Sequence, residues 1–190
     1  ITLNNRMTTY DITGLLELDD ESDQTNWLLQ YAPIRDDSLI AALESEVQRR
    51  ARTNPKTSFH ITKIILLAAS LWADQEVLAD SLYLEASTFT MLADYRKALS
   101  TFDEAANLYR SLQLDFQVAK VAIGQLNAML YLGMYQEGLT LANENMRIFQ
   151  THNDHISVAK IRLNRANIFF RLGRFQEALE NFEESRLIFL

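Results

Sequence analysis

The chain has 190 residues, of which 48% are hydrophobic and 23% are charged, a composition typical of a folded protein rather than of a disordered one. Its formal net charge of −7 argues against a general nucleic-acid binder, because such proteins need a basic surface for phosphates. Cys is absent, which excludes disulfides and thiolate chemistry within these residues and suits a protein of the reducing cytoplasm.

The first segment, residues 1–22, shows no helical period and ends in a cluster of acidic side chains. We expect this segment to be a flexible acidic leader, and it lacks the apolar run of a signal peptide. Asp23 is then expected to cap a short helix that runs through Tyr31 and is ended by Pro33, because proline cannot continue a helix.

The remainder of the N-terminal part, residues 23–73, predicts a helix hairpin. Asp36 or Asp37 is a fitting N-cap for its first helix, whose apolar positions recur at i, i+4 and i+8 (Leu39, Leu43, Val47). Asn54-Pro55 breaks this helix, and a second, largely apolar helix is expected from about 58 to 72. We expect this pair to act as a degenerate capping repeat.

Residues from 74 onward repeat with a period of 40. Tyr95, Tyr135 and Phe175 occupy equivalent positions, and further sets keep the same register (Leu92/Leu132/Leu172, Leu99/Leu139/Leu179, Phe102/Ala142/Phe182, Leu108/Ile148/Ile188, Tyr109/Phe149/Phe189). A fixed period of this length indicates a repeat array, in which each unit buries its apolar faces against its neighbours.

The array predicts three helix hairpins, at residues 74–113, 114–153 and 154–190. Their first helices are expected at about 75–92, 115–132 and 154–172, and their second helices at 95–112, 135–151 and 175–190. Asp74, Asp115 and Asp154 precede the first helices, where each carboxylate can accept bonds from otherwise unpaired backbone N–H groups.

The turn inside each hairpin is predicted to contain a left-handed residue. Gly133 and Gly173 follow the last apolar residue of their helices, where glycine takes this conformation without strain. Ala93 stands at the equivalent position of the first hairpin, and we expect its turn to differ, because a residue with a Cβ pays about 1–2 kcal/mol there. Small residues three positions after the repeated aromatic predict close helix approaches (Ala98, Gly138, Ala178).

Each repeat carries a version of one eight-residue segment. These are Leu-Ala-Asp-Tyr-Arg-Lys-Ala-Leu at 92–99, Leu-Gly-Met-Tyr-Gln-Glu-Gly-Leu at 132–139 and Leu-Gly-Arg-Phe-Gln-Glu-Ala-Leu at 172–179. They resemble the tetratricopeptide repeat, whose Asn-Leu-Gly-Asn motif is similar to 164–167 with Arg165 and Ala166 in place of Leu-Gly. The resemblance implies an all-α, right-handed superhelical solenoid of antiparallel helix hairpins.

The same resemblance implies a non-catalytic protein-interaction or scaffold module and no cofactor. Tetratricopeptide repeats usually have 34 residues, and the longer period resembles bacterial multidomain signalling proteins, including arrays that precede caspase-like CHAT domains. An alternative function is therefore a regulatory N-terminal segment of a multidomain bacterial enzyme, with the catalytic domain outside this chain.

A polar stripe on the first helices is the candidate binding site. Lys120, Asn127 and Tyr131 lie within about 20° of one another on a helix, and the next period repeats their spacing (Lys160, Asn167, Arg171). In the resembled family this face lines the concave groove that binds peptides. The stripe could hold an acidic or C-terminal peptide through charge-assisted bonds, or it could be only a solvated face.

Other site chemistry has weaker signals. His152 and His155 could ligate a metal at the i, i+3 spacing, but no third ligand is clustered with them, and a solvated loop is the alternative. Asn127 and Asn164 match the asparagine pair of the family's carboxylate-binding version, although Ile123 stands where that version has a lysine. We expect no metal, no enzyme activity, and no nucleic-acid or membrane partner.

The last helix carries apolar residues, Phe182, Ile188 and Phe189, whose equivalents one repeat earlier would be covered by the following hairpin. We therefore expect residues 1–190 to be a fragment of a larger protein. In isolation it is expected to self-associate through 175–190, because an exposed apolar surface of this kind usually has a partner.

Overall fold

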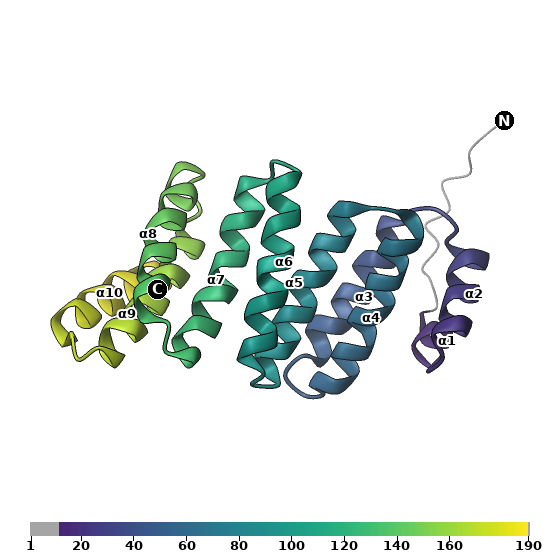
Figure 1. Ribbon diagram of the computed structural model, residues 1–190, viewed down its shortest axis with the longest axis horizontal. Coiled ribbons are helices and arrows are strands. Elements are labelled where there is room, and N and C mark those ends of the chain that lie inside the picture. Colours follow the sequence, from purple (N-terminus) through teal and green to yellow (C-terminus); the bar gives the residue numbers. More distant parts are fainter. Residues whose placement is uncertain (1–11, 190) are drawn as a thin grey trace. The chain divides into compact units, whose positions relative to one another are not determined.

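The computed structural model describes residues 12–189, in which every regular element is an α-helix. Figure 1 shows successive helices folding back on one another, which confirms the predicted all-α architecture of sequential hairpins. The helices are α1 (Thr13–Leu16), α2 (Glu21–Tyr31), α3 (Asp37–Arg50), α4 (Pro55–Trp72), α5 (Gln75–Met91), α6 (Tyr95–Ser111), α7 (Asp115–Leu132), α8 (Tyr135–Thr151), α9 (His155–Arg171) and α10 (Phe175–Phe189).

The chain divides into two compact units, with the boundary between Leu84 and Glu85 inside α5. In the first unit, α4 packs against α2 and α3 around one apolar core. The predicted stripe of α3 is confirmed, because Leu39, Leu43 and Val47 are all buried in this core. The indole of Trp72 donates a hydrogen bond to the Ala32 carbonyl at 2.9 Å, which joins the end of α4 to the end of α2.

Three details of the first unit correct the sequence-based expectations. Leu15, placed in a solvated leader, is fully buried in a short helix, while residues 1–11 of the predicted leader lie outside the described part of the chain. Asp20, not Asp23, caps α2 by accepting the N–H of Ser22 at 2.8 Å. Asn54 caps α4 through the N–H of Thr57, so this helix begins at Pro55, earlier than expected, because proline fits the first turn.

The turns between helices follow one rule from α4 to α10. A residue with positive φ occurs every 20 positions, at Ala73, Ala93, Gln113, Gly133, Asn153 and Gly173. In each case the following N–H donates to the carbonyl five residues earlier at 2.9–3.0 Å, the bond that defines a Schellman motif. The prediction for Gly133 and Gly173 is confirmed, and the expectation that the Ala93 turn would differ is wrong, because Ala93 takes the same conformation with φ 59°.

The residue after each left-handed position is the N-cap of the next helix. Asp74, Asp94 and Asp154 accept backbone N–H groups of the first turn. This confirms the predicted caps Asp74 and Asp154, whereas Asp94 was not predicted. Asp115 is not a cap but the first residue of α7, and the capping position belongs to Leu114, which offers no side-chain acceptor. Helices α5 to α10 therefore begin at 20-residue intervals whether or not a side chain caps them.

The second unit stacks α6 to α10 so that each helix packs against the next, and α7 also packs against α9. The predicted close approaches are confirmed by burial, since Ala98 and Ala178 are buried and a Cβ on Gly138 would lie 2.9 Å from Ile168 Cδ1. Gly124 provides a closer approach, because its absent Cβ would lie 2.3 Å from the ring of Phe102. Small side chains therefore set the spacing of these helices.

The burial of Ala178 makes Ala178→Glu a test of the packing between α9 and α10. The substitution places an uncompensated charge in the core, and we expect the free energy of unfolding to fall by about 3 kcal/mol or more. Glu183→Ala on the exposed side of α10 is the matched control and should change it by less than about 0.5 kcal/mol. Urea denaturation measures both, and a small effect of Ala178→Glu would contradict the packing described here.

The equivalence of Ala93 and Gly133 predicts opposite effects of exchanging their residue types. Ala93→Gly should stabilise the fold by roughly 0.5–1 kcal/mol, because glycine removes left-handed strain that exceeds its added chain entropy. Gly133→Ala should destabilise it by a similar amount, and no atom lies within 4 Å of the added Cβ to contribute a steric term. Two-state urea unfolding checks both signs, and an unchanged or lower stability of Ala93→Gly contradicts the turn rule.

Candidate functional site

The predicted stripe lies on two helices that pack against each other, α7 and α9. Lys120 and Lys160 are exposed near the N-terminal ends of these helices, and Tyr131 and Arg171 are exposed near their C-terminal ends. Asn127 and Asn167, between them, are partly buried. The structure thus places the six residues on adjacent elements as two equivalent triplets.

Asp154 brings the two lysines into one electrostatic environment. Its carboxylate accepts the N–H of Ser157 at 3.0 Å, and this bond, with the Ser157 hydroxyl, holds the pKa of Asp154 below its usual range. The charges of Lys120 and Lys160 lower this pKa further, so both ammonium groups act on the same carboxylate. Both lysines therefore lie within electrostatic range of the same carboxylate at this end of the stripe.

Aromatic contacts order two residues of the α7 triplet. The ammonium of Lys120 lies 4.8 Å from the centre of the Phe116 ring, in cation–π geometry. The ring of Tyr131 stacks on Tyr95 of α6 with 4.2 Å between centroids and 5° between planes. Burial and the neighbouring Tyr131 raise the pKa of Tyr95. These contacts fix the two side chains on the surface, although Tyr131 remains 55% exposed.

Asn127 and Asn164, which match the asparagine pair of the carboxylate-binding version of the resembled family, do not form an open site. Asn164 is buried, and its amide donates to the Ile123 carbonyl of α7 at 3.4 Å. The Oδ1 atom of Asn127 is buried and accepts no hydrogen bond from any described residue. Asn164 therefore serves the α7–α9 packing rather than a ligand.

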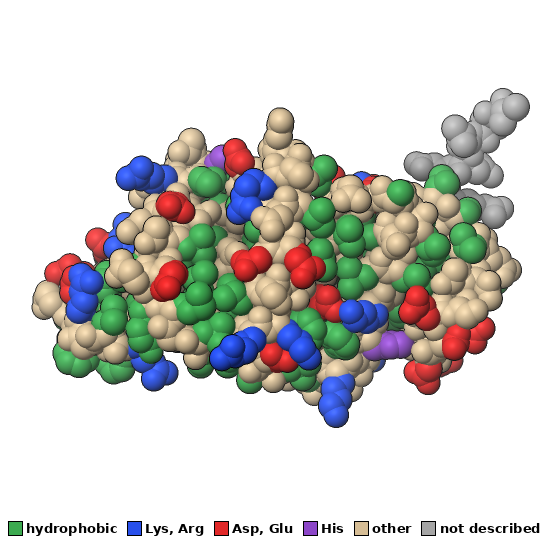
Figure 2. Space-filling view, viewed as in Figure 1, with side chains coloured by type: hydrophobic (Ala, Val, Ile, Leu, Met, Phe, Trp, Pro, Cys, Tyr) green, Lys and Arg blue, Asp and Glu red, His purple; other side chains and the backbone are tan. Residues whose placement is uncertain are grey.

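Of the two histidines, His152 has local contacts that hold its ring. His152 Nδ1 lies 2.9 Å from the Ile148 carbonyl, and its ring lies 4.8 Å from that of Phe116. Within residues 12–189 no group of three His, Cys, Asp or Glu side chains has the geometry to hold a metal ion. On the face drawn in Figure 2, acidic and basic side chains are interspersed, without the continuous basic field that binds nucleic acid.

An apolar row on α9 was not identified from the sequence. Ile156, Leu163 and Phe170, spaced by seven residues, are exposed, and Phe170 meets Phe175 of α10 edge to face at 5.6 Å. The equivalent residues of α7 are partly buried against the core (Phe116, Ile123, Leu130). On α10, Phe175, Leu179, Leu187 and Phe189 are also exposed, whereas Phe182, expected to be uncovered, packs against the core. The seven-residue spacing of these apolar positions was visible in the sequence of both repeats. The sequence did not show that the row is partly buried on α7 and exposed on α9.

None of the described helices is long and apolar enough to cross a membrane.

Comparison with known proteins supports the repeat assignment. The tetratricopeptide repeat family matches residues 121–189, which form most of α7 and all of α8 to α10. A comparison with curated proteins finds no match. Tetratricopeptide repeats are typically non-catalytic and generally bind proteins.

Two solved structures share the fold. Aspartyl phosphate phosphatase F from Bacillus subtilis matches with a TM-score of 0.65 and 14% identity, over 93% of this chain and 43% of that one. A protein from Podospora anserina, described as a kinesin light chain with nearly identical tetratricopeptide-like repeats, matches with a TM-score of 0.54 and 16% identity over 93% of both chains. This chain thus spans less than half the length of the phosphatase. Residues 121–189 are similar to the tetratricopeptide repeat family, and the chain shares the fold of the two solved repeat structures.

Proposed function

We propose that the chain is a non-catalytic protein-interaction module of the cytoplasm that binds an acidic peptide segment along the stripe of α7 and α9. The observation that carries the proposal is the pair of exposed lysines, Lys120 and Lys160, at the same end of the adjacent helices α7 and α9. Charge-assisted bonds between ammonium groups and a ligand carboxylate are about twice as strong as neutral hydrogen bonds.

The other end of the stripe suits the same ligand. Arg171 adds a third exposed cation, and the stacked ring of Tyr131 offers a rigid aromatic surface with a polar tip. An extended peptide lying along α7 and α9 would meet cations at both ends and the amides of Asn127 and Asn167 between them. This arrangement favours an acidic peptide over a basic or wholly apolar one.

A regulatory role within a longer protein is the second proposal. The observation that favours it is that the matched phosphatase contains a similar array within a chain of which these residues span 43%. In that role, binding of a ligand to the module would change the activity of a catalytic domain outside this chain. A CHAT-type peptidase domain remains one such candidate, and the sequence following this segment in its gene would decide it.

The stripe predicts a specific loss of binding on charge reversal. Lys160→Glu combined with Arg171→Glu should weaken binding of a fluorescein-labelled octaglutamate peptide by at least about tenfold, because two charge-assisted contacts become repulsive. Fluorescence anisotropy measures the affinity, and circular dichroism establishes that the variant remains helical.

Arg110→Glu with Arg147→Glu is the matched control, since both arginines are exposed on α6 and α8 and the net charge changes equally. This control should lose less than about threefold, because charges away from the contact are screened by salt. Equal losses in the two double variants would indicate a non-specific charge effect and would contradict the proposed site.

Self-association is predicted through the apolar surface of α9 and α10. Phe170 and Phe175 are 57% and 63% exposed, and the row that includes Phe170 is partly covered in its α7 copy. We expect the average mass measured by light scattering to rise with concentration, and Phe170→Ser with Phe175→Ser to abolish the rise. The control Leu112→Ser, at an exposed position after α6, should leave the rise in average mass unchanged. A strictly monomeric parent at high concentration would contradict the prediction.

A further inference from the structure

A polar pocket of about 410 Å³ lies on a different face, between α8 and α10. Its lining comes from α8, α9, α10 and the residue preceding α10 (Gln136, Leu139, Asn143, Arg165, Phe169, Arg174, Glu177, Glu180, Asn181). The stripe residues of α7 and α9 are not part of it. We call it the α8–α10 pocket.

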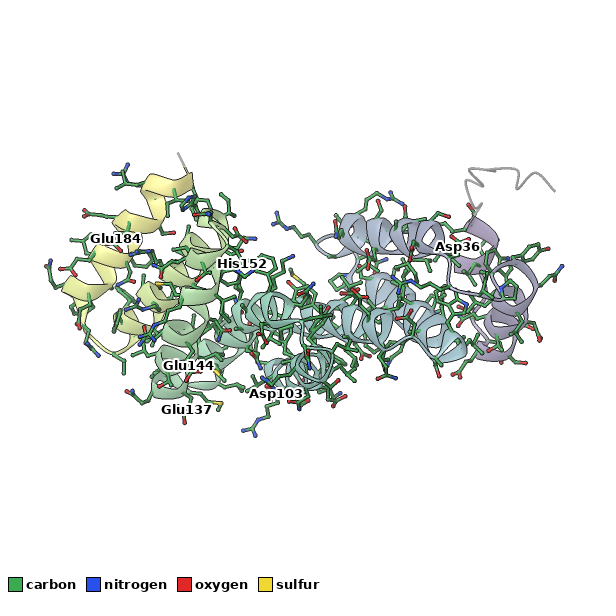
Figure 3. The ribbon with its side chains drawn as sticks, turned by 90° about the horizontal axis from the view of Figure 1, so that it is seen from above. Asp36, Asp103, Glu137, Glu144, His152 and Glu184 are labelled. Atoms are coloured by element: carbon green, nitrogen blue, oxygen red, sulfur yellow. The ribbon has the colours of Figure 1, made fainter. Side chains whose placement is uncertain are left out.

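A pocket of about 450 Å³ occurs at the equivalent place one repeat earlier, with Leu99, Asp103 and Met134 in its lining. Adding 40 to these positions gives Leu139, Asn143 and Arg174 of the α8–α10 pocket. Figure 3 shows Asp103 of α6 along the same edge of the second unit as Glu137 and Glu144 of α8. The two pockets are therefore copies of one feature of the repeat.

The polar pair in the two copies differs in charge. In the earlier copy, the amide of Gln125 donates to the carboxylate of Asp103 at 2.6 Å. Forty residues later the pair is Arg165 and Asn143, so the donor has become a cation and the carboxylate has become a neutral amide. The later copy has gained a positive charge and lost the group that would neutralise it.

Arg165 has no acidic partner in the described chain. Its Nε is buried without a hydrogen bond, and its Nη1 meets only the weak acceptor Met146 Sδ, at 3.9 Å. The nearby cations have carboxylate partners, since Arg162 pairs with Glu184 and Arg174 pairs with Glu177, although the Nε of Arg162 is also buried without a hydrogen bond. Burial, followed by the charge of Arg162, lowers the pKa of Arg165, and no carboxylate acts in the opposite direction.

We propose that the α8–α10 pocket binds the carboxylate of an aspartate or glutamate side chain from a protein partner, which ion-pairs with Arg165 in the role that Asp103 has for Gln125. The Phe169 ring supports the bound group, with the guanidinium carbons of Arg165 and Arg174 at 5.7 and 4.6 Å from its centre. Asn143 and Asn181 lie in the lining for contacts to the peptide backbone. This site adds a second acidic-residue contact on a face separate from the α7–α9 stripe.

The charge of the pocket favours a carboxylate over a phosphate. Glu177 and Glu180 also line the pocket, Glu177 neutralising Arg174 and Glu180 accepting a hydrogen bond from Gln176. The charges of the four ionic lining residues sum to zero, and Arg165 is the cation among them that forms no ion pair with a described residue. A monoanion that pairs with Arg165 meets less repulsion from Glu177 and Glu180 than a dianionic phosphate would.

The test uses the buried Nε–H of Arg165 as a reporter in ¹H–¹⁵N NMR spectra of the full chain. The probe is the blocked tripeptide acetyl-Ala-Glu-Ala-amide, and the controls are its glutamine counterpart and inorganic phosphate. We expect a saturable shift of the Arg165 resonance with the glutamate peptide and no saturable shift with the glutamine peptide. A response to the glutamine peptide equal to that of the glutamate peptide, or a stronger response to phosphate, overturns the proposal.

Two variants localise the site. Asn143→Asp places a carboxylate where the earlier repeat has Asp103, and it should raise Tm and weaken peptide binding by at least about tenfold through internal pairing with Arg165. Arg165→Gln, which copies the residue at 125, should abolish the peptide-induced shifts of the neighbouring backbone amides. If Arg165→Gln fails to fold, Asn143→Asp still decides, because unchanged binding in that variant overturns the proposal.

The variant Lys160→Glu/Arg171→Glu should retain the Arg165 response, since neither residue lines this pocket. Loss of the response in this variant would instead assign the peptide to the stripe. The proposals for the stripe and for the α8–α10 pocket can thus be contradicted independently of each other.

Discussion

The structure from α4 to α10 depends on one backbone constraint, a left-handed residue every 20 positions. The N–H after this residue bonds to a carbonyl five residues back, and the next helix begins one residue later. The 40-residue period is two such intervals. Ala73, Ala93, Gln113 and Asn153 adopt this conformation although they carry a Cβ, at a cost of roughly 1–2 kcal/mol for an ordinary residue. At Gln113 and Asn153 the packing of α6 on α7 and of α8 on α9 is available to offset that cost.

Because the constraint fixes the start of each helix, equivalent residues meet equivalent neighbours, and changes in one are matched by changes in the other. Phe102 packs its ring over Gly124, and forty residues later the pair is the smaller Ala142 and the larger Asn164. The large side chain is thus on α6 in one copy and on α9 in the other, so volume is exchanged between the two positions. The adjacent polar pair behaves differently, since Gln125 with Asp103 becomes Arg165 with Asn143 and charge is not conserved. The repeat thus preserves packing while leaving one copy with an unmatched cation.

The fold was largely predictable because periodicity reports on both helix length and buried face. The six helices after residue 74 begin and end within one residue of their predicted bounds, and the small residues Gly138 and Ala178 lie at close approaches as expected. Capping was less predictable, since Asp20 and Asn54 act at positions where several polar residues were equally suitable. The stripe of α7 and α9 followed from helical spacing, and its binding role stays a prediction. The α8–α10 pocket could not be predicted. The sequence shows Arg165 in place of the motif leucine, but it does not show that Asn143 of α8 lines the same pocket.

The central claim is that the turn geometry belongs to the array rather than to glycine. The most direct measurement is the intraresidue NOE between the amide proton and Hα at Ala73, Ala93, Gln113 and Asn153. A positive φ brings these two protons close together, so the account predicts strong cross-peaks at all four residues, comparable with those of Gly133 and Gly173. Weak cross-peaks typical of right-handed helix at Ala93 or its equivalents would contradict it, since the 20-residue rule would then hold only where glycine permits it.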